Sequence, residues 1–344
     1  MSDVSNILKT GDEMLVSVVM SVYNSQDYLR ESIESVLNQS YENFEFIIIN
    51  DGSTDLSESI IFEYDDSRIV YSSNIKNKGL IYSLNKGVSL AKGKYIARFD
   101  SDDICMKYRL ECQLNFLVNN CEYNVVGSTA EIINSNGEFQ GHFRLPETDV
   151  EIKTAMIFSN QIIHPAAMIR MESLNSLSCY YDLNYKHAED YKLWLDLSSC
   201  GKFYNIQKPL IKYRVHGDNI SIKHSGQQET LSKILSHEFC IINSIKFDVE
   251  AYKNILYKRI IEQSDVEVFY EIFDNDSFIK QSYLAKIYFV GLINLKKRGG
   301  RIIKPFFKSR FKKRINHIVI VLFYPLLCCL PKFVIKKYFR VLLE

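Results

Sequence analysis

The strongest constraint on the fold is an alternation of strand-length apolar runs with helical apolar stripes through the first hundred residues. Residues 15–23 and 44–50 are apolar runs rich in β-branched side chains, a pattern typical of strands buried on both faces. Apolar positions in residues 80–91 follow a helical spacing instead, and another strand-length run covers residues 94–99. Because parallel strands need crossover helices, this alternation predicts an α/β domain with a parallel sheet.

Polar side chains follow the predicted strands where each strand ends. Asn24 follows the first run, Asp51 follows the second, and Asp100, Asp102 and Asp103 follow the last. The carboxyl ends of parallel strands meet at one edge of a sheet, where ligands bind, so we expect one shared cleft. Clustered carboxylates are hard oxygen ligands suited to Mg²⁺ or Mn²⁺ bridging to phosphate oxygens. A solvated acidic turn is the alternative interpretation.

The formal net charge of +1 hides a strong asymmetry along the chain. Residues 277–344 contain 16 Lys or Arg residues and one acid, a net of +15, which leaves −14 on the rest. A basic tail on an acidic body indicates an anionic partner, either a membrane or nucleic acid.

The eight cysteines show no Cys-x-x-Cys pair and no His/Cys zinc spacing, so we expect reduced thiols in a cytosolic protein. The acids Asp3, Asp12 and Glu13 do not fit a signal peptide. We therefore expect the acidic body of the chain in the cytoplasm.

The second half of the chain has a mixed pattern. Residues 125–133 and the stretch after Asn136-Gly137 predict a hairpin, since Asn-Gly favours a tight turn. Residues 148–158 predict a helix, residues 162–171 predict a strand, and a further helix begins near Glu189. Two short strands are predicted at 203–206 and 210–215, followed by a helical pattern without motifs up to about residue 290.

Several short motifs occur in a characteristic order. They are residues 17–24, 50–55, 77–80, 91–103, 188–191 and 213–216. The most distinctive read Asn50-Asp51-Gly52-Ser53-Thr54-Asp55, Phe99-Asp100-Ser101-Asp102-Asp103 and Ala188-Glu189-Asp190-Tyr191. Together they resemble the inverting family 2 glycosyltransferases, of the bacterial type that builds polysaccharides and glycolipids, and the resemblance spans residues 15–217.

The resemblance implies a GT-A fold, which is a Rossmann-like α/β domain with a mostly parallel sheet and flanking helices. It also implies a nucleotide-diphosphate sugar donor, most often a UDP-sugar. Asp51 would accept the imide N–H of the nucleobase, and Asp102, with Asp100 or Asp103, would hold Mg²⁺ or Mn²⁺ on the diphosphate. Asp190 would be the general base that removes a proton from the attacking hydroxyl.

Other residues are assigned to the same site by the resemblance. Residues expected to bind the nucleotide-sugar are Asn24, Asp51, Lys78, Arg98, Asp100 and Arg214. The expected metal ligands are Asp102, Asp103 and His216.

Structural alternatives stay open for several of these assignments. Arg98 can equally pair with an acid of the cluster, and Arg214 and His216 can lie in a surface loop. Asp190 can be an acid favoured by the helix macrodipole. Asp55 can be a helix cap, and His164 can be a core histidine.

The basic tail has its own pattern. Ten Lys or Arg residues between 296 and 314 are interleaved with phenylalanines, and an apolar run at 318–330 is broken by Pro325. That run is shorter than the roughly 20 residues of a membrane-spanning helix. We therefore expect a helical, basic element that lies on an anionic membrane. A buried C-terminal helix hairpin is the alternative, and nucleic acid is not expected because no binding module accompanies the charge.

These observations lead to one overall prediction. An N-terminal tail covers 1–14, the GT-A catalytic domain 15–220, a helical extension 221–295 and a membrane-associating tail 296–344. The enzyme is expected to transfer a sugar, with inversion, to a hydroxyl of a glycan or lipid-linked acceptor in cell-surface polysaccharide biosynthesis. It would work as a peripheral or monotopic protein at the inner face of the cell membrane.

Two alternatives remain from other functional classes. A nucleotidyltransferase would also use a nucleotide cleft and acidic metal ligands, although no Gly-rich phosphate loop follows the first strand. A non-catalytic membrane-bound scaffold could use the same fold.

Overall fold

The computed structural model describes residues 14–156, 159–217, 219 and 223–242, and every structural statement below concerns these residues. The chain divides into two compact units, Met1–Phe239 and Cys240–Glu344. The fold described here is that of the first unit. The predicted basic tail at 296–344 lies outside the described residues, so its structure stays a prediction.

The first half of the unit is a parallel sheet with the strand order β3-β2-β1-β4. Its strands are β1 (Val16–Val22), β2 (Phe44–Asn50), β3 (Ile69–Ser73) and β4 (Tyr95–Asp100). The helices between them are α1 (Leu29–Leu37), α2 (Ser57–Ile61) and α3 (Leu80–Leu90). All residues of β2 are buried, and all but one of β1 are, because helices cover both faces of these central strands. The predicted α/β class is confirmed.

After β4 the sheet continues with strands of mixed direction, in the order β8-β6-β9-β5. These strands are β5 (Ile104–Cys105), β6 (Tyr123–Asn134), β8 (Met168–Arg170) and β9 (Lys202–Val215). β8 is antiparallel to β4 and β6, whereas β6 and β9 are parallel. The short edge strand β7 (Phe139–Phe143) pairs with β6 through the predicted Asn-Gly turn, in which Gly137 has a φ of +81°.

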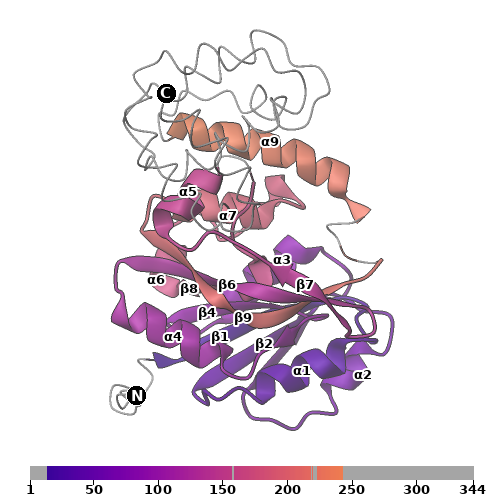
Figure 1. The fold of residues 1–344 in the computed structure, drawn as a ribbon. Helices are drawn as coiled ribbons and strands as arrows, with labels where there is room; N and C mark the ends of the chain where they lie inside the picture. Colours follow the sequence, from indigo (N-terminus) through magenta and orange to yellow (C-terminus); the bar gives the residue numbers. More distant parts are fainter. Residues whose placement is uncertain (1–13, 157–158, 218, 220–222, 243–344) are drawn as a thin grey trace, which may run out of the picture. The chain divides into compact units, whose positions relative to one another are not determined.

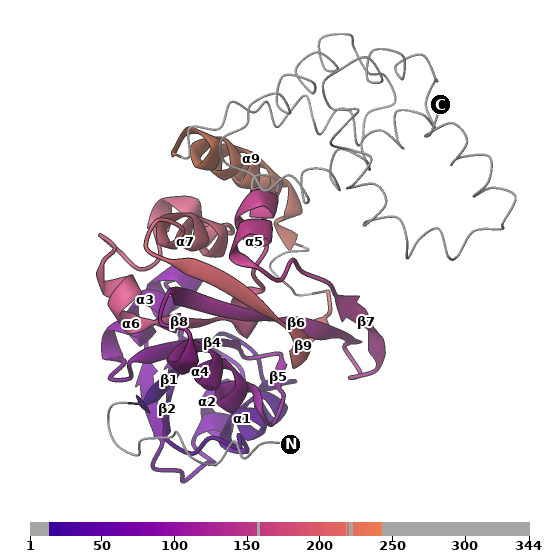
Figure 2. The ribbon, with the colours of Figure 1, turned by 60° about the vertical axis from the view of Figure 1, so that its left-hand side comes forward.

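Helices cover the two faces of the sheet (Figures 1 and 2). Apolar residues of α1, α2 and α4 (Arg109–Asn119) join one core cluster with alternate residues of β1, β2 and β4. The opposite face carries α3, where a Cβ added at Gly87 would lie 2.5 Å from Val19 Cγ1. This close approach explains a glycine in the middle of a helix.

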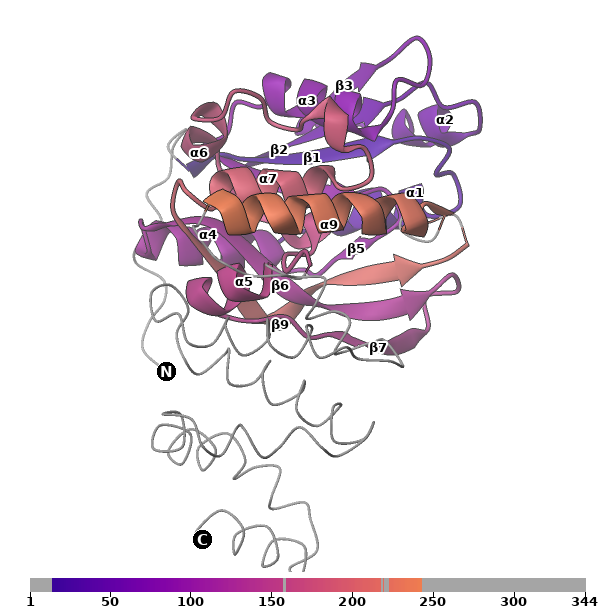
Figure 3. The ribbon, with the colours of Figure 1, turned by 90° about the horizontal axis from the view of Figure 1, so that it is seen from above.

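The remaining helices belong to the second half of the domain. They are α5 (Asp149–Met156), α6 (Met171–Asn175), α7 (Glu189–Leu197) and α9 (Ser225–Ile242), with 3₁₀ turns at His164–Ala166 and Leu183–Tyr185. Figure 3 shows α9 running alongside α7. Tyr185 Oη, just before α7, donates a hydrogen bond of 2.9 Å to Glu238 Oε1 of α9. Among the described residues, no helix is both long and apolar enough to span a lipid bilayer.

Two local predictions need correction. The expected strand at 162–171 is only three residues long, because Pro165 has no backbone N–H and sits in a 3₁₀ turn. The two strands expected at 203–206 and 210–215 are one continuous strand, β9, which runs through Pro209 with an irregular register against β6.

The loops after β1, β2 and β3 come together at the carboxyl edge of the sheet. Asn24, with a φ of +49°, accepts a hydrogen bond on Oδ1 from the N–H of Thr54 at 2.8 Å. Gly52 has a φ of +69°, and a Cβ there would lie 2.5 Å from the carbonyl carbon of Lys76. Only glycine allows the loop after β2 to lie this close to the loop after β3.

Candidate active site

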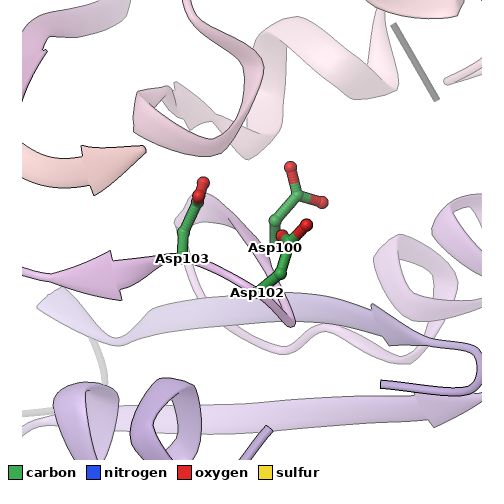
Figure 4. A group of neighbouring side chains, drawn as sticks. All are labelled: Asp100, Asp102 and Asp103. Carbon is green, nitrogen blue, oxygen red and sulfur yellow. The ribbon is translucent and has the colours of Figure 1, made fainter. Parts of the chain in front are cut away.

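The acidic cluster lies where β4 ends. Asp100 is the last residue of β4, and Asp102 and Asp103 lie in the short turn before β5. One carboxylate oxygen of each lies within 4.8 Å of those of the other two, and Figure 4 shows the three side chains rising on the same side of the turn. Three carboxylates this close repel one another unless a cation or a proton intervenes.

Asp103 is the most enclosed of the three acids, with 1% of its surface exposed. Its Oδ1 accepts a hydrogen bond from the N–H of Arg214 at 2.8 Å, while Oδ2 has no hydrogen-bond partner among the described residues. Burial raises the pKa of Asp103 well above its ordinary value, and the Asp102 and Asp100 charges raise it further. A buried carboxylate oxygen without a partner, beside two other acids, fits a divalent cation site.

His216 lies beside Asp102, directly after the end of β9. Its Nε2 lies 2.9 Å from Asp102 Oδ2, and its ring lies 5.0 Å from that of Tyr28 between centroids. β9 reaches the cluster because it pairs antiparallel with β5, which directly follows Asp103. The structure thus places His216 in contact with Asp102, one of the other two predicted metal ligands. The group whose ligand atoms all lie within 4.8 Å of one another is Asp100, Asp102 and Asp103, and it does not include His216. The carboxylates of the cluster are ligands that suit Mg²⁺ or Mn²⁺.

Arg214 is buried beneath the cluster and contacts protein groups through its whole side chain. Nε donates to the carbonyl of Asp102 at 2.8 Å, and the terminal nitrogens reach the carbonyls of Asn134 and Ser135 and the carboxylate of Glu31. Arg214 therefore positions the acidic turn in this structure. Its predicted contact with the nucleotide-sugar stays a prediction.

Arg98 lies on β4 beside the cluster, and it is 3% exposed. Its guanidinium forms an ion pair with Asp100, which was one of the two interpretations that the sequence left open. Among the described residues, its Nε has no hydrogen-bond partner. Burial is the largest single influence and lowers the pKa of Arg98, but the charge and hydrogen bond of Asp100, with smaller contributions from Tyr181 and Asp103, together outweigh it. The pKa of Arg98 is therefore raised overall, and the side chain stays charged.

Asp51, which is predicted to bind the nucleobase, is also buried, and its carboxylate holds the neighbouring loop in place. Its carboxylate accepts hydrogen bonds from the N–H groups of Lys78 and Gly79, at 3.0 and 2.8 Å, and from Asn74 Nδ2 at 2.7 Å. The Lys78 amine is 3.1 Å from Tyr82 Oη in an exposed contact. Asp51, Lys78 and Asn24 thus belong to adjoining loops at the carboxyl edge of the sheet, and their contact with a nucleotide stays a prediction.

Asp190 lies in the first turn of α7, as the sequence predicts. Its Oδ2 accepts a hydrogen bond from Asn160 Nδ2 at 2.6 Å, and Oδ1 accepts one from the N–H of Tyr191 at 2.7 Å. Burial raises the pKa of Asp190 to about 6 and that of the neighbouring Glu189 to about 7. A carboxylate with a raised pKa that is partly exposed has the properties of a general base.

Electrostatics connects the base to the acidic cluster. The positive charge of Arg98 lowers the pKa of Asp190 and of Asp103 against the larger effect of burial. Tyr181 lies in the same region, since Arg98, Asp190 and Asp100 all act on its hydroxyl. The charge of Arg98 therefore acts on both the predicted metal site and the predicted base.

Sequence reasoning missed three residues of this region. Asn160 contacts Asp190, Tyr181 Oη is 2.9 Å from His164 Nε2, and Asn85 forms two hydrogen bonds with the backbone of Tyr181. His164 is buried, which confirms it as a core histidine. No spacing rule could have identified Asn160 or Asn85, because their partners lie 30 and 96 residues away.

Comparisons with known proteins show the family to which the chain belongs. Residues 17–177 match the family model described as Glycosyl transferase family 2. An uncharacterized glycosyltransferase of Haemophilus influenzae is 34% identical over 314 residues, which cover 86% of this chain and 97% of that protein.

Two further relatives have more specific names. The Escherichia coli UDP-Glc:alpha-D-GlcNAc-diphosphoundecaprenol beta-1,3-glucosyltransferase WfgD is 32% identical over 212 residues, covering 61% of this chain and 81% of that protein. The crystal structure of S. aureus TarS 1-349 in complex with UDP-GlcNAc shares the fold, with a TM-score of 0.55 and 17% identity over 84% of this chain and 83% of that chain. Since the Haemophilus influenzae protein is matched over nearly its whole length, this chain belongs to glycosyltransferase family 2.

Proposed function

We propose that the protein transfers a sugar from a UDP-sugar, with inversion, to a hydroxyl of a glycan or lipid-linked acceptor in cell-surface polysaccharide or glycolipid synthesis. Two relatives support the donor class, since the name of WfgD includes UDP-Glc and TarS crystallised with UDP-GlcNAc. The name of WfgD also includes a diphosphoundecaprenol acceptor, which is lipid-linked.

The acidic cluster is the proposed site of a divalent cation. Asp102, Asp103 and His216 would hold the ion, and Asp100 would complete the site beside Arg98. A cation bound there would stabilise the negative charge that develops on the leaving diphosphate. The unpartnered Asp103 oxygen in a crowded acidic cluster is the observation that carries this assignment.

Asp190 is the proposed general base. It accepts the proton of the acceptor hydroxyl while the hydroxyl oxygen bonds to the anomeric carbon and the bond from that carbon to the diphosphate oxygen breaks. Because the attack comes from the face opposite the leaving group, the anomeric configuration inverts. The N–H of Tyr191 donates to Asp190 Oδ1, and Asn160 Nδ2 donates to Asp190 Oδ2. Each carboxylate oxygen has a second lone pair, which can accept the proton.

The tail supports a location at the membrane. We propose that the enzyme works as a peripheral protein at the inner face of the cell membrane, because the +15 charge of residues 277–344 would attract anionic lipid. A lipid-linked acceptor would be presented at the same surface.

The test is donor turnover by the full-length protein. UDP-glucose, UDP-galactose and UDP-GlcNAc are each incubated with Mn²⁺ or with EDTA, and released nucleoside diphosphate is measured. We expect release with one donor in Mn²⁺ and none in EDTA. Release of pyrophosphate from a nucleoside triphosphate would support a nucleotidyltransferase instead. No release with any donor would support a non-catalytic scaffold.

Thermal stability gives a second readout for the same panel. A donor at 100 times its Kd should stabilise the folded protein by about 2.7 kcal/mol. This stabilisation should require Mn²⁺ if the cation links the acidic cluster to the diphosphate.

A further inference from the structure

Asn160, which follows α5 in the chain, contacts Asp190 in the first turn of α7. The amide Nδ2 of Asn160 donates to Asp190 Oδ2 at 2.6 Å, across 30 residues of sequence. The other Asp190 oxygen accepts the N–H of Tyr191 at 2.7 Å. Each carboxylate oxygen therefore has one protein donor, and the carboxylate is held in one orientation.

The orientation of the Asn160 amide is determined by its other contact. Asn160 Oδ1 accepts a hydrogen bond from the N–H of Ile162 at 2.9 Å. A flipped amide would turn its NH₂ group toward that N–H and its oxygen toward the Asp190 carboxylate, so both contacts would be lost. The nitrogen of Asn160 is thus the atom that faces the base.

The backbone beside Asn160 is anchored in the sheet. Asn205, a fully buried residue of β9, donates through Nδ2 to the carbonyl of Gln161 at 3.0 Å and to that of Pro146 at 2.8 Å. The facing position on β6 is Gly127, where an added Cβ would lie 2.2 Å from Asn205 Oδ1. The position of Asn160 is therefore set by the β6–β9 pair.

We propose that Asn160 is a positioning residue for Asp190, whose amide holds the carboxylate oriented so that its remaining lone pairs receive the proton of the acceptor hydroxyl. The inference rests on the proposed function, in which Asp190 is the base. It concerns a residue that does not contact the substrate and acts only through Asp190.

The groups around Asp190 predict the sign of the effect on its titration. The Asn160 hydrogen bond, the N–H of Tyr191 and the Arg98 charge all favour the ionised carboxylate. Among the described residues, Glu189 and Tyr181 also interact electrostatically with it. Removing the Asn160 donor should therefore raise the pKa of Asp190 above about 6.

The sharpest variant is Asn160→Asp, which has the same shape. One carboxylate oxygen of this variant still accepts the hydrogen bond from the N–H of Ile162. The other oxygen stands where the NH₂ group of Asn160 donated to Asp190, so an acceptor now faces the Asp190 carboxylate. With the UDP-sugar turned over fastest in the panel above, kcat near pH 7 should fall by about 10–100-fold with a nearly unchanged donor KM. The acid limb of the pH profile should move to higher pH, so the deficit should shrink as pH rises.

Two further variants separate positioning from general damage. Asn160→Ala removes the donor without adding a charge, so its acid limb should lie between those of the wild type and Asn160→Asp. Gln161→Glu adds the same charge one residue away, where the side chain contacts the carbonyls of Ala155 and Ser159 and has no contact with Asp190. Its acid limb should coincide with that of the wild type.

A substrate-free measurement completes the test. The Asp190 carboxyl is titrated by ¹³C NMR in aspartate-labelled full-length protein, with its resonance assigned by loss in Asp190→Asn. Both Asn160 variants should raise its midpoint, with Asn160→Asp giving the larger shift. Unchanged midpoints, or an equal shift in Gln161→Glu, would overturn the inference. If Asp190→Asn instead keeps full transfer, the proposed function has failed, whatever the Asn160 variants show.

Discussion

His216 Nε2 lies 2.9 Å from Asp102 Oδ2, so the end of β9 meets the turn after β4 across 114 residues of sequence. The same strand end contributes the N–H of Arg214, which binds Asp103 Oδ1. Two consecutive acids are therefore held by one strand from the other half of the domain. This arrangement makes the acidic cluster a preformed site, and the first prediction tests it.

The change Asp102→Asn should abolish transfer without unfolding the protein. Loss of a metal ligand should cost at least about 100-fold in turnover, since even outer groups around a metal cost 10–100-fold. The melting temperature should stay equal or rise, because one of three crowded negative charges is gone. Asp65→Asn, at an exposed acid outside the cluster, is the control. Full activity in EDTA would remove the cation from the mechanism.

Asp190→Asn should lower turnover by about 10²–10⁴-fold with donor binding nearly unchanged, as expected for loss of a general base. Asp196→Asn on the same helix, whose carboxylate pairs with Lys192, is the matched control and should transfer normally. The anomeric configuration of the wild-type product is read by NMR. A product with retained configuration would contradict the single-displacement mechanism.

The pH dependence of turnover should show an acid limb near pH 6. The pKa of Asp190 is raised to about 6 by burial, and the base must be ionised, so kcat should fall as pH falls through that value. Glu189, with a pKa near 7, titrates beside it, so the limb reports both acids together. Buffers from pH 5 to 9 with constant ionic strength give the profile, and a flat profile over that range would argue against Asp190.

The raised pKa of Asp190 also predicts a pH effect on stability. Turnover should increase with pH, whereas the stability of the folded protein should decrease. In the unfolded chain an Asp titrates near pH 4, so the folded protein loses stability as pH rises from about 4 to about 6 and Asp190 ionises inside it. Asp190→Asn removes this cost. Its melting temperature relative to wild type should be higher at pH 8, and the difference should vanish near pH 4.

The membrane prediction concerns the basic tail, which lies outside the described residues. Replacing Lys308, Arg310, Lys312, Lys313 and Arg314 by Gln in the full-length chain should strongly weaken binding to vesicles that contain phosphatidylglycerol. Each basic residue near such a surface contributes about 1 kcal/mol, which salt screens. Sedimentation measures the bound fraction, with phosphatidylcholine vesicles as the control. Equal binding of wild type to both vesicle types would contradict an electrostatic attachment.

Much of the first half of the fold was predictable because its signals are local. The apolar runs that became β1 and β2 are buried almost throughout, and burial of both strand faces requires continuous apolar sequence. The acids after β4 were placed correctly by the rule that parallel strands end at one edge. The Asn136-Gly137 turn was predictable because glycine readily adopts a positive φ.

The second half was less predictable because its register depends on distant partners. Residues 162–171 have strand-like composition, yet only Met168–Arg170 pair with β4 and β6. Apolar composition indicates that a segment is buried, but it does not show that the segment is a strand. His164–Ala166 are buried in a 3₁₀ turn. Nothing in residues 203–215 alone shows that β6 holds them as one strand.

Local sequence patterns were enough to predict the α/β class, the position of the acids at a strand end and the family to which the motifs point. Each of these depends on side-chain patterns within a few residues of one another. Only the tertiary structure showed that Arg98 pairs with Asp100, that Arg214 holds the turn of Asp102 and Asp103, and that Asn160 contacts Asp190. These contacts depend on which strands pair with each other and on which polar atoms become buried away from water. Neither property can be derived from residues that are close in sequence.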